Sequence, residues 1–308
     1  MRFRTALATL LLTTVALSGQ PAVAAAPATI AHAQRTQTWK LVLTNGNVVQ
    51  VPEALTEAPD DAANAGARAP FLVSGDGRHF FYFRKSDGLF VERTLSGGER
   101  VVSPRLTASS INEEWPLVSN DGGYVVTGTS APGMGIFADL RKGKVLPPPG
   151  GTDAWAFAGF SPDSDRLLLA GERLTVFDRG LRARTRLKTS LSPTALANDH
   201  VTAAVPVGTW RKYRQLRLLD LRTGRASGTV TVGLPRGQYI DDLDFDQAGR
   251  VIVRSRTATG VAVYRVSTTT GKATPLRKIT RPDVEVWVLP GDSTYELWTE
   301  KAGQAPRK

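Results

Sequence analysis

Short runs of apolar residues alternate with small turns along almost the whole chain. In six places an apolar run ends at a turn that carries Asp or Gly, and a second apolar run follows at once. One copy runs from Leu72-Val73 through Ser74-Gly75-Asp76-Gly77-Arg78 into the aromatic run 80–83. Aspartate bonds nearby backbone amides, and glycine accepts the positive φ that a tight hairpin needs. Each copy therefore predicts a pair of antiparallel strands.

The six turns recur at a regular distance. Their reference positions are Asp76, Asp121, Asp163, Asp199, Asp246 and Asp292. Successive positions are separated by 45, 42, 36, 47 and 46 residues, close to the roughly 40–50 residues of a four-stranded propeller blade. A second hairpin with a glycine turn follows five of the six turns. The spacing predicts an all-β protein, a six-bladed β-propeller, with no long helix after residue 34.

The sixth unit lacks its outer hairpin, and the missing half lies at the other end of the chain. Runs 39–43 and 47–52 flank Asn45-Gly46, and Asn-Gly between alternating apolar residues is the strongest short hairpin signal. We expect these strands to pair with strands at 284–289 and 294–299. Pairing N-terminal outer strands with C-terminal inner strands closes the ring and removes exposed sheet edges.

The N-terminus has the pattern of a secretory signal. Arg2 and Arg4 precede an uncharged apolar stretch over 5–18, and Ala22-Val23-Ala24 fits the A-x-A cleavage pattern. A retained anchor is the alternative, but the stretch is short for a span of about 20 residues. The predicted organisation is a signal peptide at 1–24, a flexible leader at 25–37, a propeller at 38–300 and a disordered tail at 301–308. The mature protein is expected to be secreted or envelope-associated, monomeric and without a membrane span.

Two turns carry a resemblance to known repeats. Ser74-Gly75-Asp76-Gly77-Arg78 and Phe160-Ser161-Pro162-Asp163, each between apolar strands, resemble the repeats of the TolB-like and WD40-like (PD40-type) β-propellers. The resemblance covers about residues 38–300 and implies an exported propeller that binds partner proteins at the cell envelope. TolB proteins also have an N-terminal α/β domain, for which these boundaries leave no room. The Trp-Asp dipeptide of true WD40 repeats is absent.

The residue inventory favours binding over catalysis. The chain has no cysteine, which excludes cysteine nucleophiles, cysteine metal ligands and disulfides. Its three histidines, His32, His79 and His200, fall in different parts of the repeat, and no G-x-S-x-G or phosphate-binding motif is present. We therefore expect a non-catalytic binding module with no cofactor and no metal. A channel-site hydrolase or lyase on the propeller scaffold is the alternative.

Charge indicates the class of partner. The formal net charge of +11 favours association with anionic surfaces, although a charge of this size can also serve solubility alone. The expected partner is an envelope protein or an anionic wall polymer, with no specific nucleic acid.

Two groups of residues are candidates for the binding site. Segments that enter the innermost strands combine carboxylates, which select cationic groups, with aromatics, which supply contact area. These residues are Glu113, Glu114, Trp115, Asp153, Trp155, Tyr239, Asp241, Asp242, Glu285 and Trp287. The alternative is that the tryptophans pack between blades and the acids are solvated.

The second group mixes cations with aromatics between the second and third strands of the fourth unit, and consists of Trp210, Arg211, Lys212, Tyr213 and Arg214. This mixture suits an anionic polymer, and the alternative is a solvated loop.

Overall fold

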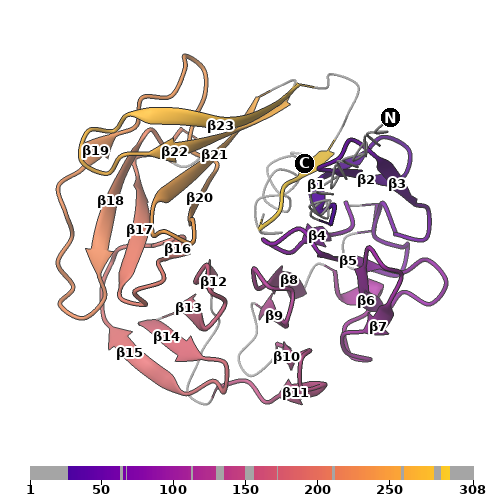
Figure 1. The fold of residues 1–308 in the computed structure, drawn as a ribbon. Helices are drawn as coiled ribbons and strands as arrows, with labels where there is room; N and C mark the ends of the chain where they lie inside the picture. The colour runs from indigo at the N-terminus through magenta and orange to yellow at the C-terminus, as the bar shows by residue number, and fades with distance from the viewer. Residues whose placement is uncertain are drawn as a thin grey trace, which may run out of the picture.

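Six four-stranded antiparallel sheets surround a central axis (Figure 1). The computed structural model describes residues 27–62, 65–66, 68–111, 114–129, 135–149, 156–171, 173–209, 212–257, 260–280 and 286–291. Each sheet is one blade, which confirms the predicted six-bladed β-propeller. Within these residues, no helix is long and apolar enough to cross a membrane. The predicted signal peptide and tail lie outside the described residues.

Five blades are built from consecutive strands. The first contains β4 (Phe71–Val73), β5 (His79–Phe83), β6 (Phe90–Thr94) and β7 (Glu99–Val101). The second contains β8 (Glu114–Val118), β9 (Tyr124–Thr129), β10 (Phe137–Asp139) and β11 (Lys144–Leu146). The third contains β12 (Ala156–Phe160), β13 (Arg166–Ala170), β14 (Leu174–Asp178) and β15 (Ala183–Leu187). The fourth contains β16 (Ala195–Leu196), β17 (Thr202–Val207), β18 (Gln215–Asp220) and β19 (Val230–Thr231). The fifth contains β20 (Asp242–Phe245), β21 (Val251–Thr257), β22 (Gly260–Val266) and β23 (Ala273–Thr280).

The sixth blade joins the two ends of the chain, in the order β24 (Val286–Val288), β1 (Ile30–Arg35), β2 (Trp39–Leu43) and β3 (Val48–Val51). Figure 1 shows these strands side by side. The predicted closure between N-terminal outer and C-terminal inner strands is therefore confirmed. The two ends contribute different numbers of strands from those predicted. Three strands of this blade come from the N-terminal end, and β1 pairs directly with β24.

The flexible leader predicted over 25–37 is wrong for residues 30–35, which form β1. Its sequence, Ile-Ala-His-Ala-Gln-Arg, has polar residues that suggest a solvated segment, yet all six positions are buried. The polar groups are bonded inside the protein, for example the Arg35 guanidinium, which donates to the Thr56 carbonyl over 2.6 Å. The strand predicted at 294–299 lies outside the described residues, and β1 occupies the place beside β24 that it was expected to fill.

Apolar layers between neighbouring blades make up the core. In the layer between the sixth and first blades, the Trp39 and Phe71 rings stack with centroids 4.4 Å apart, and both side chains are fully buried. The Trp39 indole N–H also donates to the Leu55 carbonyl over 3.0 Å. A side chain that fills such a layer fixes the angle between two blades, so the ring depends on tight packing at each of them.

Hydrogen bonds link successive turns at one end of the channel, called here the turn face. The links from the first four blades to the next are Asp76 N to Asn120 O at 2.8 Å, Asp121 N to Ser164 Oγ at 3.0 Å, Asp163 N to Asn198 Oδ1 at 2.8 Å, and Asn198 Nδ2 to Gln247 O at 3.0 Å. Gln247 also donates from Nε2 to the Pro162 carbonyl over 2.6 Å, which ties the fifth blade to the third. The repeated turn therefore serves as the connection between blades.

Candidate functional site

Six of the fifteen candidate residues lie outside the described residues: Glu113, Asp153, Trp155, Trp210, Arg211 and Glu285. Glu114 and Trp115 are placed by their backbone only, at the start of β8. Whether these eight residues bind a ligand stays a prediction. The other seven belong to blades four, five and six.

The acidic candidates of the fifth blade have a partner inside the protein. Arg254 on β21 is opposite Asp242 on β20, and its Nη1 donates to the Asp242 carboxylate over 2.6 Å. Its Nη2 is 3.3 Å from the Asp244 carboxylate and 3.0 Å from the Pro290 carbonyl. The Arg254 side chain is only 8% exposed. Asp241 accepts a hydrogen bond from the Arg256 backbone N–H. This geometry gives the acidic segment a structural role in joining blades five and six.

The aromatic candidates of this region differ in exposure. Trp287 is 8% exposed and packs with Val261 and Leu289 between the fifth and sixth blades, which is the arrangement that the packing alternative expected. Tyr239 is half-buried. A ligand could contact Tyr239 directly, whereas the Trp287 side chain is largely covered.

Of the three candidates in the fourth-blade loop that the structure describes, two make contacts within the protein and one is exposed. The Arg214 guanidinium donates to the Leu234 and Pro235 carbonyls, and Tyr213 packs against the core between blades four and five. Lys212 is exposed. Arg214 therefore holds the connection into the fifth blade in place.

Each histidine is bonded to a neighbour. His79 Nδ1 is 2.5 Å from Glu92, His200 Nε2 is 2.8 Å from Asp163, and His32 Nε2 is 3.3 Å from the Gln34 side-chain oxygen. None of these three contacts joins a histidine ring to a serine hydroxyl, as a nucleophile–base pair requires. In the described ranges, no group of three His, Asp or Glu residues could hold a metal ion. The absence of a metal or cofactor stays a prediction.

The His79–Glu92 pair makes stability depend on pH. The hydrogen bond to Glu92 raises the pKa of His79 above 6.5, against the effect of burial. Burial opposes ionisation of Glu92, but His79 and Arg100 outweigh it and lower its pKa below 4.5. The histidine contribution is full below pH 6.5 and is lost as pH rises through its raised pKa; the glutamate contribution is full above pH 4.5 and is lost as pH falls through its lowered pKa.

We therefore expect His79→Gln to cost about 1–2 kcal/mol of unfolding free energy at about pH 5.5 and clearly less at about pH 9. Urea denaturation of both proteins at the two pH values measures this difference. An equal cost at both values would contradict an ionised pair.

The positive charge of the protein is concentrated in one part of the ring. Residues 179–240 contain twelve lysines and arginines but only two acidic residues, Asp199 and Asp220, against a formal net charge of +11 for the whole chain. This segment, called here the basic sector, covers β15, the fourth blade and the connection to the fifth. The sector includes the predicted loop at 210–214, but most of its cations were not among the predicted candidates.

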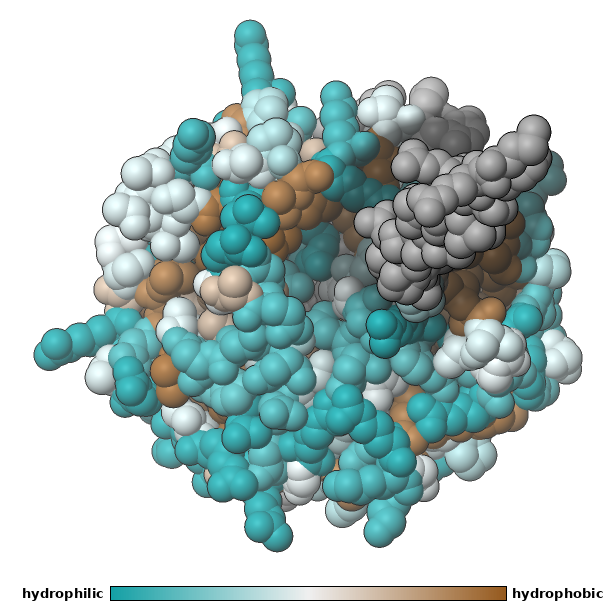
Figure 2. Space-filling view, in the orientation of Figure 1, coloured by the Kyte–Doolittle hydropathy of each residue, from teal (hydrophilic) through white to brown (hydrophobic). Residues whose placement is uncertain are grey.

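A row of exposed cations follows the outer edge of the third blade, at Arg182, Arg184, Arg186 and Lys188. Arg184 pairs with Asp178, while Arg186 and Lys188 have no ion pair in the described part of the chain. The turn at 221–225 lies beside this row, because a Cβ on Gly224 would be 3.1 Å from Leu187. That turn adds the exposed Arg225. Figure 2 shows a largely hydrophilic surface over this part of the ring, at the lower left. The sequence contained a signal for this row, because Arg or Lys occupies every second position from 182 to 188.

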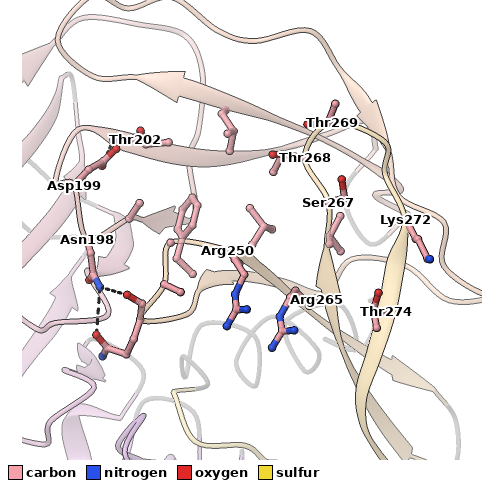
Figure 3. A pocket seen from close by; sticks show the side chains of 18 residues that line it. Asn198, Asp199, Thr202, Arg250, Arg265, Ser267, Thr268, Thr269, Lys272 and Thr274 are labelled. Carbon is pink, nitrogen blue, oxygen red and sulfur yellow. Dashed lines mark hydrogen bonds between the residues drawn. The ribbon is translucent and has the colours of Figure 1, made fainter.

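A pocket of about 880 Å³ opens between the fourth and fifth blades on the turn face (Figure 3). The turns after β16 and β20 and the turn between β22 and β23 surround it. Its polar side chains include Arg250, Arg265 and Lys272, together with several threonines, and Phe245 contributes to its apolar wall. Sequence reasoning missed this pocket, because its walls come from two blades whose separation is set only by their packing.

Comparisons with known proteins find similarity at the level of structure only. No protein-family model matches the chain, and no curated protein matches its sequence. TolB from Acinetobacter baumannii is 17% identical with a TM-score of 0.49, over 85% of this chain and 66% of that one, so this chain spans slightly less than two thirds of it. A putative TolB from Agrobacterium tumefaciens is 14% identical with a TM-score of 0.48, over 83% of this chain and 91% of that one.

An enzyme is also among the similar structures. Virginiamycin B lyase from Staphylococcus aureus is 10% identical with a TM-score of 0.46, over 80% of this chain and 78% of that one. A fold does not by itself select a function. The chain's classification as a six-bladed β-propeller rests on its own order of sheets.

Proposed function

We propose that this chain is an exported, non-catalytic propeller of the TolB-like and WD40-like type that binds an anionic polymer of the cell envelope. The observation that carries the proposal is the basic sector, with twelve cations against two carboxylates in 62 consecutive residues. Export follows from the signal-like N-terminus, with cleavage after Ala24. An envelope protein with an acidic surface is the other partner that this charge would attract, and the experiment below separates the two.

The arrangement of the cations fits a polymer with repeated negative charges. Arg184 and Arg186 on β15 and Lys188 just after it place three cations along one edge of the third blade, and within the described residues Arg186 and Lys188 have no ion pair. Arg225 extends the charged surface onto the fourth blade. Exposed charges of this kind attract a polyanion at long range, and salt weakens that attraction because ions screen it.

Sedimentation of the mature protein with isolated cell envelope, across a salt series, tests the proposal. We expect binding at low salt that falls steeply as salt rises. Changing Arg186, Lys188 and Arg225 to alanine together should weaken it by about tenfold or more. The matched control changes Arg78, Lys85 and Lys144 to alanine, because these cations are also exposed but belong to the first and second blades. The control should keep most of the binding.

Three outcomes would count against the proposal. Equal losses in the two triple variants would show that net charge alone matters, without a defined sector. Binding that resists salt would indicate a specific protein partner. No sedimentation at any salt would contradict envelope binding altogether.

A further inference from the structure

The pocket between the fourth and fifth blades has cationic groups that the protein does not fully use. Arg250 and Arg265 both line it, and Figure 3 shows their guanidinium groups next to each other. A single carboxylate, Asp246, lies near both: Arg250 Nε donates to it over 2.7 Å, whereas Arg265 Nε is 3.8 Å away. Two guanidinium groups thus share one negative charge, and their mutual repulsion is only partly balanced.

Arg265 is only weakly paired. Its Nε is buried and makes no hydrogen bond, and no other hydrogen bond of its guanidinium occurs within the described residues. The Arg265 side chain is 38% exposed, so its guanidinium can donate to an acceptor bound in the pocket. Lys272 adds an exposed ammonium group at the edge of the same pocket, without an ion pair in the part of the chain that the structure describes.

The rest of the lining suits a polyhydroxylated ligand. Thr268, Thr269 and Thr274 supply hydroxyl groups along the side formed by the fifth blade (Figure 3). Phe245 and Leu218 add apolar surface to the lining, against which the C–H face of a sugar or polyol could pack. The volume of about 880 Å³ is within the range of small-ligand pockets, about 300–1,000 Å³.

We propose that this pocket binds a sugar phosphate or polyol phosphate, with the phosphate between Arg250 and Arg265 and the hydroxyl groups toward the threonines. Guanidinium groups bind phosphate oxygens through paired, charge-assisted hydrogen bonds. The inference rests on the proposed function, since a phosphate-containing envelope polymer would present this group. It adds a defined recognition site on the turn face to the diffuse attraction of the basic sector.

Calorimetric titration at constant ionic strength, with glucose 1-phosphate, glucuronate, glucose and inorganic phosphate as probes, tests the site. We expect glucose 1-phosphate to bind most tightly, because only it satisfies the arginines and the threonines together. Arg265→Ala should weaken this binding by about tenfold or more, and Arg265→Lys should restore it only in part, because lysine lacks the paired donors. The control is Lys278→Ala, which removes an exposed cation of the same blade outside the pocket.

The outcomes separate the site from the proposed function. Equal binding of glucose 1-phosphate by the wild type and by a folded Arg265→Ala variant would overturn the pocket, as would tighter binding of glucuronate or no heat with any probe. Thermal unfolding of each variant shows whether it is folded. If the probe binds through Arg265 but the protein does not sediment with envelope, the site holds and the envelope function fails. If sedimentation depends on the basic sector while the probes do not bind, the function holds and the pocket is wrong.

Discussion

Replacing Arg254 by methionine is expected to lower the free energy of unfolding by about 3–5 kcal/mol. The substitution removes a positive charge that is 8% exposed and leaves the Asp242 and Asp244 carboxylates, 13% and 19% exposed, without it. It also removes the hydrogen bond to Pro290, which connects the fifth blade to the sixth. Desolvated carboxylates repel each other strongly in the protein interior, and methionine fills the space without adding a donor. Urea denaturation followed by tryptophan fluorescence measures the loss.

Two further variants separate charge from volume. Arg222→Met removes a partner from Asp220, but there the two side chains are 67% and 33% exposed, so we expect a much smaller loss of stability than for Arg254→Met. Adding Asp242→Asn and Asp244→Asn to Arg254→Met should recover part of the stability, because the unbalanced charges are gone. A loss below about 1 kcal/mol for Arg254→Met alone, or no recovery in the triple variant, would contradict this account.

A chain that begins at residue 38 is expected to lose the cooperative unfolding transition that we expect of a chain beginning at residue 27. The shorter chain lacks β1, which joins β24 to β2 and contributes the buried Ile30 and Ala33 to the core. It also loses the bond of 2.7 Å from Ile30 N to the Gly77 carbonyl in the first blade. Removing one large buried aliphatic side chain costs about 2–5 kcal/mol. The free-energy cost of removing a whole buried strand should therefore be comparable to the net stability of a typical domain, which is about 5–15 kcal/mol.

Circular dichroism during thermal unfolding of the two chains provides the measurement. A synthetic peptide of residues 27–37, added to the shorter chain, serves as a control because it should fill the vacant strand position and restore the transition. Equal midpoints for the two chains would show that residues 30–35 contribute little to closure, as expected for a flexible leader.

The two predictions bear on the proposed function as well. Arg254 and β1 hold the fifth, sixth and first blades together. If their loss opened the ring, the pocket between blades four and five would keep its residues, but its walls would lose their fixed separation. Variants in the pocket should therefore be compared only where thermal unfolding shows an intact ring.

The repeated turns and the fold were determined by the sequence itself. Asp and Gly at fixed positions, as in Asp76-Gly77 and Asp121-Gly122, set a hairpin locally, because the side chain and backbone of a few neighbouring residues define it. The distance between turns then gave the number of blades, and Asn45-Gly46 located the hairpin of the closing blade. The concentration of positive charge over 179–240 can also be seen in the sequence. Because the strands of one blade are consecutive in sequence, charges that are close in sequence are also close in the folded blade.

Contacts between blades were decided only by the tertiary structure. The acidic run at 241–244 looked free to receive a cationic ligand, until the register of β20 on β21 placed Arg254 opposite Asp242. Residues 30–35 looked like a solvated leader, until burial in the sixth blade gave their polar groups partners such as the Thr56 carbonyl. The pocket beside Arg265 likewise exists only because two blades pack at a given separation. Local patterns define hairpins and blades, whereas pairing over long distances depends on how complete blades pack together, and no short stretch of sequence contains that information.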